Sequence, residues 1–142
     1  MLFFEALTML ALAALAVRLL PFRTLTKTLG WGGAGHGNSS EPPASRPAQI
    51  AQAVWRASRR SPWRTVCIHR GIAVQWMLRR RGLDGRFHYG LSQADSVLSA
   101  HVWVSLGGTI LIGEEEASRY RCVAEFPPGG ATQPLDGQGT ST

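Results

Sequence analysis

The order of the hydrophobic patterns predicts an α+β fold, in which helices come first and a small antiparallel sheet follows. Apolar residues recur with helical spacing up to Arg81, and strict alternation of apolar and polar residues begins only after Gly82. Gly107 and Gly108 separate two alternating segments, which predicts a hairpin there. A chain of 142 residues can bury one domain's core, so we expect one domain of the α+β class.

The N-terminal segment, residues 1–29, is predicted to be helical. Its uncharged run from Ala6 to Val17 is shorter than the roughly 20 residues that span a bilayer. Glu5 precedes this run, where a signal peptide would carry positive charge. Pro21 ends the first helix and leaves room for a short second one. We expect a helix that is buried or faces a partner in a cytoplasmic protein, with membrane association as the less favoured alternative.

Composition divides the rest of the chain into three parts. Residues 30–46 are rich in Gly, Ser and Pro and are predicted to be a flexible linker. Residues 47–126 carry the regular patterns and form the predicted main domain. Residues 127–142, rich in Gly, Thr, Pro and Gln, are predicted to be a disordered tail.

Two helices are predicted at the start of the main domain. Ser45 can cap a helix that begins near Pro47, since proline suits the first helical turn. The longest helical pattern runs over residues 65–81, carries arginines in its last turn, and stops at Gly82. Cys67 therefore falls in the first turn of this second helix.

Four strands and a short charged segment are predicted after the helices. The alternating segments are residues 86–91 and 97–106, and the hairpin partner of the second is residues 109–114. A charged helix or loop at 115–120 and a last strand at 122–126 complete the antiparallel meander.

Cys67 and His101 are the predicted nucleophile and base. The first turn of a helix has unpaired N–H groups, which favour a thiolate. A cysteine at the start of a helix followed by a histidine in a strand is the chain order of papain-like and transglutaminase-like enzymes. Alone, a helical cysteine is more often an inert core residue, and a strand histidine is usually just half buried. The prediction therefore depends on the pair.

Glu114 is predicted to complete a triad. If the hairpin has a two-residue loop, Leu106 faces Thr109 and His101 faces Glu114, with Cβ atoms within about 5.5 Å. A carboxylate there could hold the imidazole in one tautomer. A bulge would break this register, and the alternative is that residues 114–116 are a solvated acidic run.

Four sequence segments carry a resemblance to a known family. They are Ser61–Cys67 (SPWRTVC), Gln75–Gly82 (QWMLRRRG), Ala100–Val104 (AHVWV) and the opening from Glu5 to Arg23. Together these segments resemble the lasso-peptide biosynthesis B protein in its stand-alone protease form, over about residues 2 to 126. That resemblance implies a papain/transglutaminase-like core in which the family's cysteine and histidine match Cys67 and His101.

The resemblance also implies a function and partners. It implies a bacterial cysteine peptidase that removes the leader from a lasso-peptide precursor. The implied partners are the precursor leader peptide, a separate leader-recognition protein and an ATP-dependent lasso cyclase. The family often has an aspartate about a dozen residues after the histidine, and here Gly113 stands at that spacing with Glu114 beside it.

Other classes of site find less support in the sequence. The four histidines lack metal-ligand spacing with the two cysteines, so no metal or cofactor is expected. Net charge is +6, but the basic clusters lack interleaved aromatic residues, so no nucleic-acid partner is expected. Cys122 has no neighbouring histidine in the sequence and is predicted to be a core residue. Two other functions stay open: a non-catalytic adaptor that holds the precursor for the cyclase, and a transglutaminase-type acyl transferase.

Overall fold

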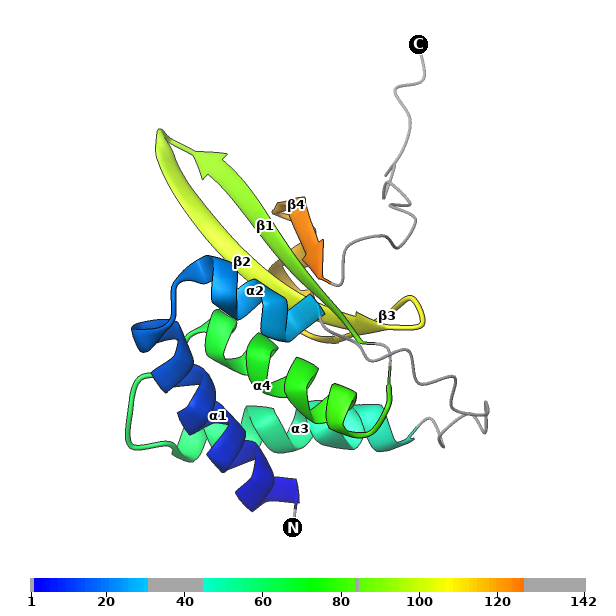
Figure 1. The fold of residues 1–142 in the computed structure, drawn as a ribbon. Coiled ribbons are helices and arrows are strands. Elements are labelled where there is room, and N and C mark those ends of the chain that lie inside the picture. The colour runs from blue at the N-terminus through cyan, green and yellow to red at the C-terminus, as the bar shows by residue number, and fades with distance from the viewer. Residues whose placement is uncertain (1, 31–44, 84, 127–142) are drawn as a thin grey trace.

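The computed structural model describes residues 2–30, 45–83 and 85–126, and its element order is helices before sheet, as predicted (Figure 1). The helices are α1 (Leu2–Leu19), α2 (Phe22–Gly30), α3 (Ser45–Arg60) and α4 (Cys67–Arg80). The second half contains β1 (Arg86–Ala94), β2 (Val97–Leu106), β3 (Thr109–Ile112), the short α5 (Glu114–Ala117) and β4 (Arg121–Phe126). The predicted α+β class is confirmed.

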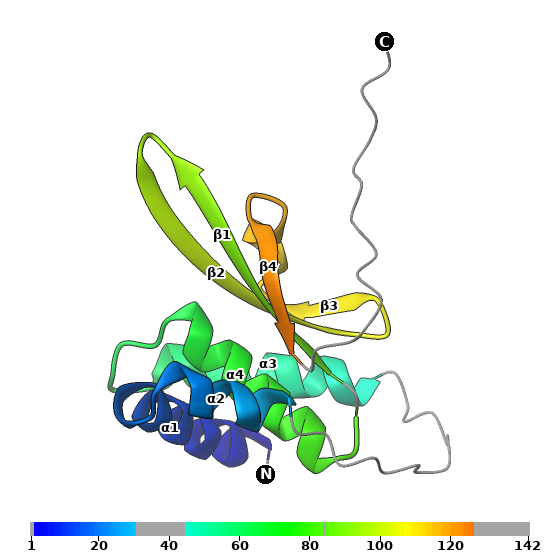
Figure 2. The same ribbon diagram turned by 45° about the horizontal axis from the view of Figure 1, so that its top comes forward.

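The four strands form one antiparallel sheet in the order β3-β2-β1-β4. Strands β1 and β2 are the longest, and their hairpin extends well beyond the helices (Figure 2). Asp95 and Ser96 form its two-residue turn and both have positive φ, which matches the right-handed twist of the paired strands. The other edge of the sheet, at β3, lies beside α3 and α4.

Helix α4 packs directly against the sheet and fixes the position of its own first residue, Cys67. A Cβ atom at Gly71 would lie 2.5 Å from Val102 Cγ1 and 2.9 Å from a ring carbon of Phe87. Glycine at this position therefore allows the helix backbone to approach the side chains of β1 and β2 closely. Cys67 lies one turn before this contact.

Helix α1 belongs to the same hydrophobic core. Its Ala6, Leu10 and Ala13 are fully buried against α3 and α4. Glu5 adds an ion pair to Arg81, with Oε2 2.7 Å from a guanidinium nitrogen. The N-terminal helical segment therefore packs on the main domain as part of one body.

The predicted boundaries fall partly outside the described residues. Gly30 ends α2, and Ser45 and Arg46 already belong to α3. The rest of the predicted linker and the whole predicted tail at 127–142 lie outside the described residues.

Among the described residues, α1 is the one helix that is long and apolar enough to cross a membrane by length and composition, with a mean hydropathy of 1.9.

Candidate active site

Cys67 is the first residue of α4, so it lies in the first turn of the helix as predicted, although the helix begins two residues later than expected, and its side chain is partly buried. Val66 precedes it as the N-cap in extended conformation, with φ −113°. The first turn of a helix leaves its leading N–H groups without intrahelical acceptors, so the amides of Cys67 and Ile68 point out of the helix end beside the sulfur. These groups can stabilise a thiolate or an oxyanion.

His69 helps to fix this helix end. Its Nδ1 accepts a hydrogen bond from the Val66 amide at 3.3 Å, the reach-back half of a capping box. Burial lowers the pKa of His69 below its ordinary value of 6.5, because an imidazolium would lose its hydration. The ring therefore stays neutral and keeps the lone pair that the Val66 amide needs.

His101 lies in β2, is 8% exposed, and is held by three contacts. Its Nε2 lies 2.9 Å from the carbonyl oxygen of Gly113. Its ring stacks on Trp103 at 6.1 Å between centroids and meets Tyr120 at 5.1 Å. A carbonyl can only accept, so Nε2 carries the proton and Nδ1 keeps the lone pair of the neutral ring. The contacts thus select the tautomer in which Nδ1 is basic.

Gly113 stands at the spacing from His101 where the resemblance led us to expect an aspartate, and its surroundings admit no side chain. Its φ is +86°, and a Cβ atom would lie 2.6 Å from the Val102 carbonyl oxygen and 2.9 Å from Trp103 Cβ. The close approach brings the backbone carbonyl to the ring of His101 instead. A main-chain carbonyl therefore occupies the place of the orienting side chain.

The register predicted for Glu114 is wrong. The first two pairs of the β2–β3 hairpin follow the prediction, but a bulge then places Val104 opposite Ile112. Strand β3 ends at Ile112, and Glu114 begins α5, exposed to solvent, instead of extending the ladder to His101. Glu114 still lines the same cleft, and its predicted catalytic role stays a prediction.

The acid nearest His101 is Glu116, which the sequence reasoning missed. Its Oε2 lies 4.0 Å from Nδ1 of His101, and its side chain is about half exposed. The acidic run was visible in the sequence, but the bulge and the turn of α5 decide which of its three carboxylates reaches the ring.

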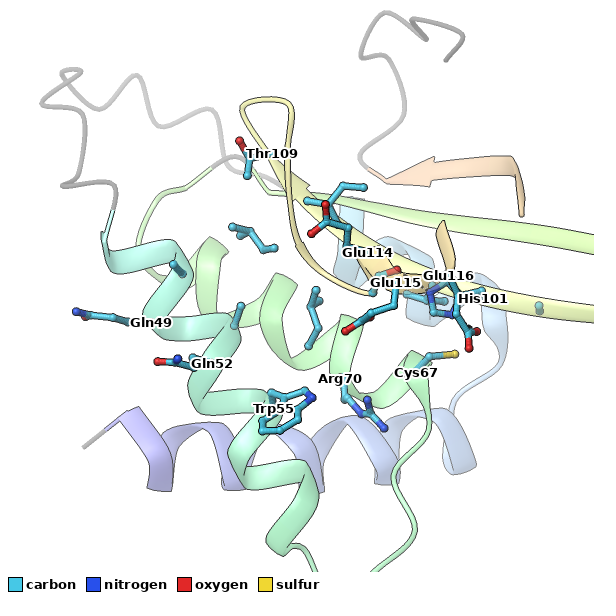
Figure 3. A pocket seen from close by; sticks show the side chains of 18 residues that line it. Gln49, Gln52, Trp55, Cys67, Arg70, His101, Thr109, Glu114, Glu115 and Glu116 are labelled. Carbon is cyan, nitrogen blue, oxygen red and sulfur yellow. Dashed lines mark hydrogen bonds and ion pairs between the residues drawn. The ribbon is translucent and has the colours of Figure 1, made fainter. Parts of the chain in front are cut away.

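Cys67 and His101 line one open cleft of about 1080 Å³ between α3, the start of α4, and the segment from β3 to α5 (Figure 3). Figure 3 shows the sulfur and the imidazole at the same end of this cleft, with Glu116 beside the ring. No hydrogen bond joins the two groups among the described residues. Trp55 of α3 and Arg70 of α4 also line this cleft. No group of three or more metal-ligating side chains occurs in the described part of the chain.

Cys122 corrects a second prediction, because it is exposed and has a histidine beside it. Its sulfur lies 3.9 Å from Nδ1 of His88 and 3.4 Å from the carbonyl oxygen of Ala124, which can accept from the thiol. Nε2 of His88 lies 2.8 Å from the hydroxyl of Ser105. Although Cys122 is exposed as a residue, partial desolvation of its thiol raises the pKa of this group above its ordinary value. Burial lowers the pKa of His88 below 6.5, so both groups are held neutral near pH 7.

Comparison with known proteins gives one match. Residues 9–125 match the family model described as the transglutaminase-like superfamily. No curated protein and no solved structure matches the chain. The matched span runs from within α1 to β4 and includes both walls of the cleft.

Proposed function

The chain belongs to the transglutaminase-like superfamily, whose cysteine chemistry is of the protease or acyltransferase type, and on that premise we propose that it is a leader peptidase acting on a lasso-peptide precursor. Cys67 is the proposed nucleophile and His101 the proposed base. One observation carries the proposal: both residues open on one cleft, and His101 is held in the tautomer with a basic Nδ1.

The first half-reaction forms a thioester. Nδ1 of His101 takes the proton of the Cys67 thiol, and the sulfur attacks the carbonyl carbon of the scissile bond. The leading amides of α4 stabilise the oxyanion that develops on the carbonyl oxygen. The C–N bond then breaks, and the imidazolium returns its proton to the leaving amine.

The second half-reaction releases the leader as a carboxylic acid. His101 takes a proton from water, the resulting hydroxide attacks the thioester, and the sulfur leaves and regains the proton. In each half-reaction the imidazolium has N–H groups on both nitrogens. The Gly113 carbonyl accepts from one, and Glu116 lies near enough to stabilise charge at the other.

The choice of a lasso-peptide precursor is supported by sequence motifs around the site. The segments Ser61–Cys67 and Ala100–Val104, which resemble the lasso B protein, include the two proposed catalytic residues. The cleft is open, as a site for an extended peptide segment must be. The proposed partners are the precursor leader, a separate recognition protein and the cyclase, as the same resemblance implies.

The test is cleavage of a precursor in the presence of its recognition protein, measured by mass spectrometry. Cys67→Ala is expected to lose at least about 10³-fold in kcat/KM, since removal of a covalent nucleophile leaves only binding and oxyanion stabilisation. Cys122→Ala is the matched control, because it removes the other thiol and is expected to retain activity.

Three outcomes would contradict the proposal. Undiminished cleavage by Cys67→Ala would refute the nucleophile. A product in which the leader is joined to an amine would indicate a transglutaminase-type acyl transferase. No cleavage by the wild type, together with a requirement for the protein in cyclisation, would indicate the adaptor.

A further inference from the structure

Helix α1 has a second apolar face, opposite the one that packs in the core. The inner face carries the buried Ala6, Leu10 and Ala13. At 100° per residue, Phe4, Leu12, Leu15 and Leu19 share one stripe on the opposite side. Their side chains are 72%, 46%, 53% and 69% exposed.

This outer face offers almost no polar side-chain group to water. Thr8 lies on the same stripe, but its hydroxyl donates to the Phe4 carbonyl at 2.9 Å. Ala11, also exposed, is the neighbouring small residue. Contiguous exposed apolar patches are rare on monomeric soluble proteins and mark interaction sites.

Basic side chains border the outer face on both sides. Arg18 is exposed in the last turn of α1, at one edge of the stripe. The guanidinium of Arg60 lies over the ring of Phe3, 5.8 Å from the ring centroid, at the same edge of the stripe as Arg18. At the other edge, guanidinium nitrogens of Arg80 and Arg81 lie 3.4 Å and 2.7 Å from carboxylate oxygens of Glu5. Two arginines and one glutamate leave a net positive charge at this edge as well.

The positive charge of this border is part of a wider asymmetry in the chain. Before Gly82 the sequence has only two acidic residues, Glu5 and Glu41, whereas most of its arginines lie there. The acidic run Glu114–Glu116 lies in α5, beside the sheet. A negatively charged partner is therefore attracted to the helical layer rather than to the sheet.

We propose that the outer face of α1 binds the surface of an anionic membrane. A lipid bilayer with anionic headgroups supplies both chemistries that the face presents: acyl chains for the leucines and phenylalanine, and phosphates for the bordering arginines. The helix lies in the interface instead of crossing it. Crossing would pull Ala6, Leu10 and Ala13 out of the core and break the pair between Glu5 and Arg81.

The test is flotation of the full chain with lipid vesicles. Vesicles containing phosphatidylglycerol are expected to carry the wild type, and pure phosphatidylcholine vesicles are expected to carry much less. A triple variant, Leu12→Gln, Leu15→Gln and Leu19→Gln, is expected to bind at least 10-fold more weakly. Arg18→Gln is expected to weaken binding about 5-fold, an effect that high salt reduces.

The matched control uses other exposed apolar residues. Val97→Gln with Leu98→Gln alters the tip of the β1–β2 hairpin, far from α1, and is expected to bind like the wild type. Circular dichroism checks that each variant is folded. Equal flotation of the triple variant, or no flotation of the wild type, would overturn the proposal. A third outcome would also overturn it: the wild type is a dimer that does not float, and the triple variant is a monomer. A second copy of the chain would then cover the face.

Discussion

Two cysteine–histidine pairs occur in the described part of the chain, and the backbone around each sulfur differs. Cys67 begins a helix, where free amides favour negative charge, and shares a cleft with His101. Cys122 lies in a strand, where its thiol can donate to the Ala124 carbonyl, and its partner is His88. The same two residue types are thus held in opposite electrostatic surroundings.

The two histidines differ in a corresponding way. Nε2 of His101 is bound to a main-chain carbonyl, which fixes its proton and leaves Nδ1 as a base. His88 stacks on Trp103 at 5.4 Å, and its two ring nitrogens meet the Ser105 hydroxyl and the Cys122 sulfur, so no main-chain carbonyl fixes its proton. The sulfur of Cys122 lies 3.9 Å from the imidazole of His88, but this contact alone does not favour a nucleophile. The helix end and the selected tautomer matter more.

The largest expected difference between the pairs comes from removing each histidine. His101→Ala is expected to reduce kcat/KM for leader cleavage by about 10² to 10⁴-fold, because general acid–base catalysis is lost. His88→Ala is expected to keep a kcat/KM within about 5-fold of the wild type, measured at a temperature where the variant is folded. Similar losses in both variants would break the distinction.

A smaller effect is expected from the acids around His101. Glu116→Gln is expected to lower kcat/KM by about 5-fold or less, since a half-exposed pair is worth about 0 to 1 kcal/mol. Glu114→Gln and Glu115→Gln are the matched controls and are expected to have no effect. A selective loss with Glu114→Gln would support the original triad instead.

The smallest effect concerns stability and pH. Burial lowers the pKa of both His69 and His88 in the folded state, so the unfolded chain binds more protons below about pH 6.5. The free energy of unfolding is therefore expected to be fully retained above that pH and to fall as the pH decreases. Urea denaturation between pH 5 and 8 measures this free energy of unfolding. The variant His88→Gln should reduce the dependence of the free energy of unfolding on pH. A stability that rises as the pH falls would contradict the neutral state of both rings.

Local patterns in the sequence predicted the order of elements, the place of Cys67 in the first turn of a helix and the hairpin after Leu106. They did not predict the bulge that ends β3 early, because it depends on how the backbone passes Trp103 with Gly113 in a left-handed conformation. The carboxylate nearest the ring of His101 is therefore that of Glu116 and not that of Glu114.

The pair of Cys122 and His88 was missed for a different reason. It depends on β4 pairing with β1, two strands that are not consecutive in the chain, and on a register shift between Tyr89 and Gly90. Alternation within one strand shows which residues share a face, but it does not show which strand lies beside it. Sequence spacing from a histidine was therefore a poor guide to the surroundings of Cys122.

The most direct test of the contrast between the two thiols is competitive alkylation of the folded wild type with iodoacetamide at pH 7. Burial raises the pKa of Cys122 above 9.0, so almost none of it is thiolate at that pH. Peptide mass spectrometry is expected to find Cys67 modified first, with protection by the precursor and its recognition protein. Modification of Cys122 at a rate equal to or faster than that of Cys67 would contradict the assignment of Cys67 as the nucleophile.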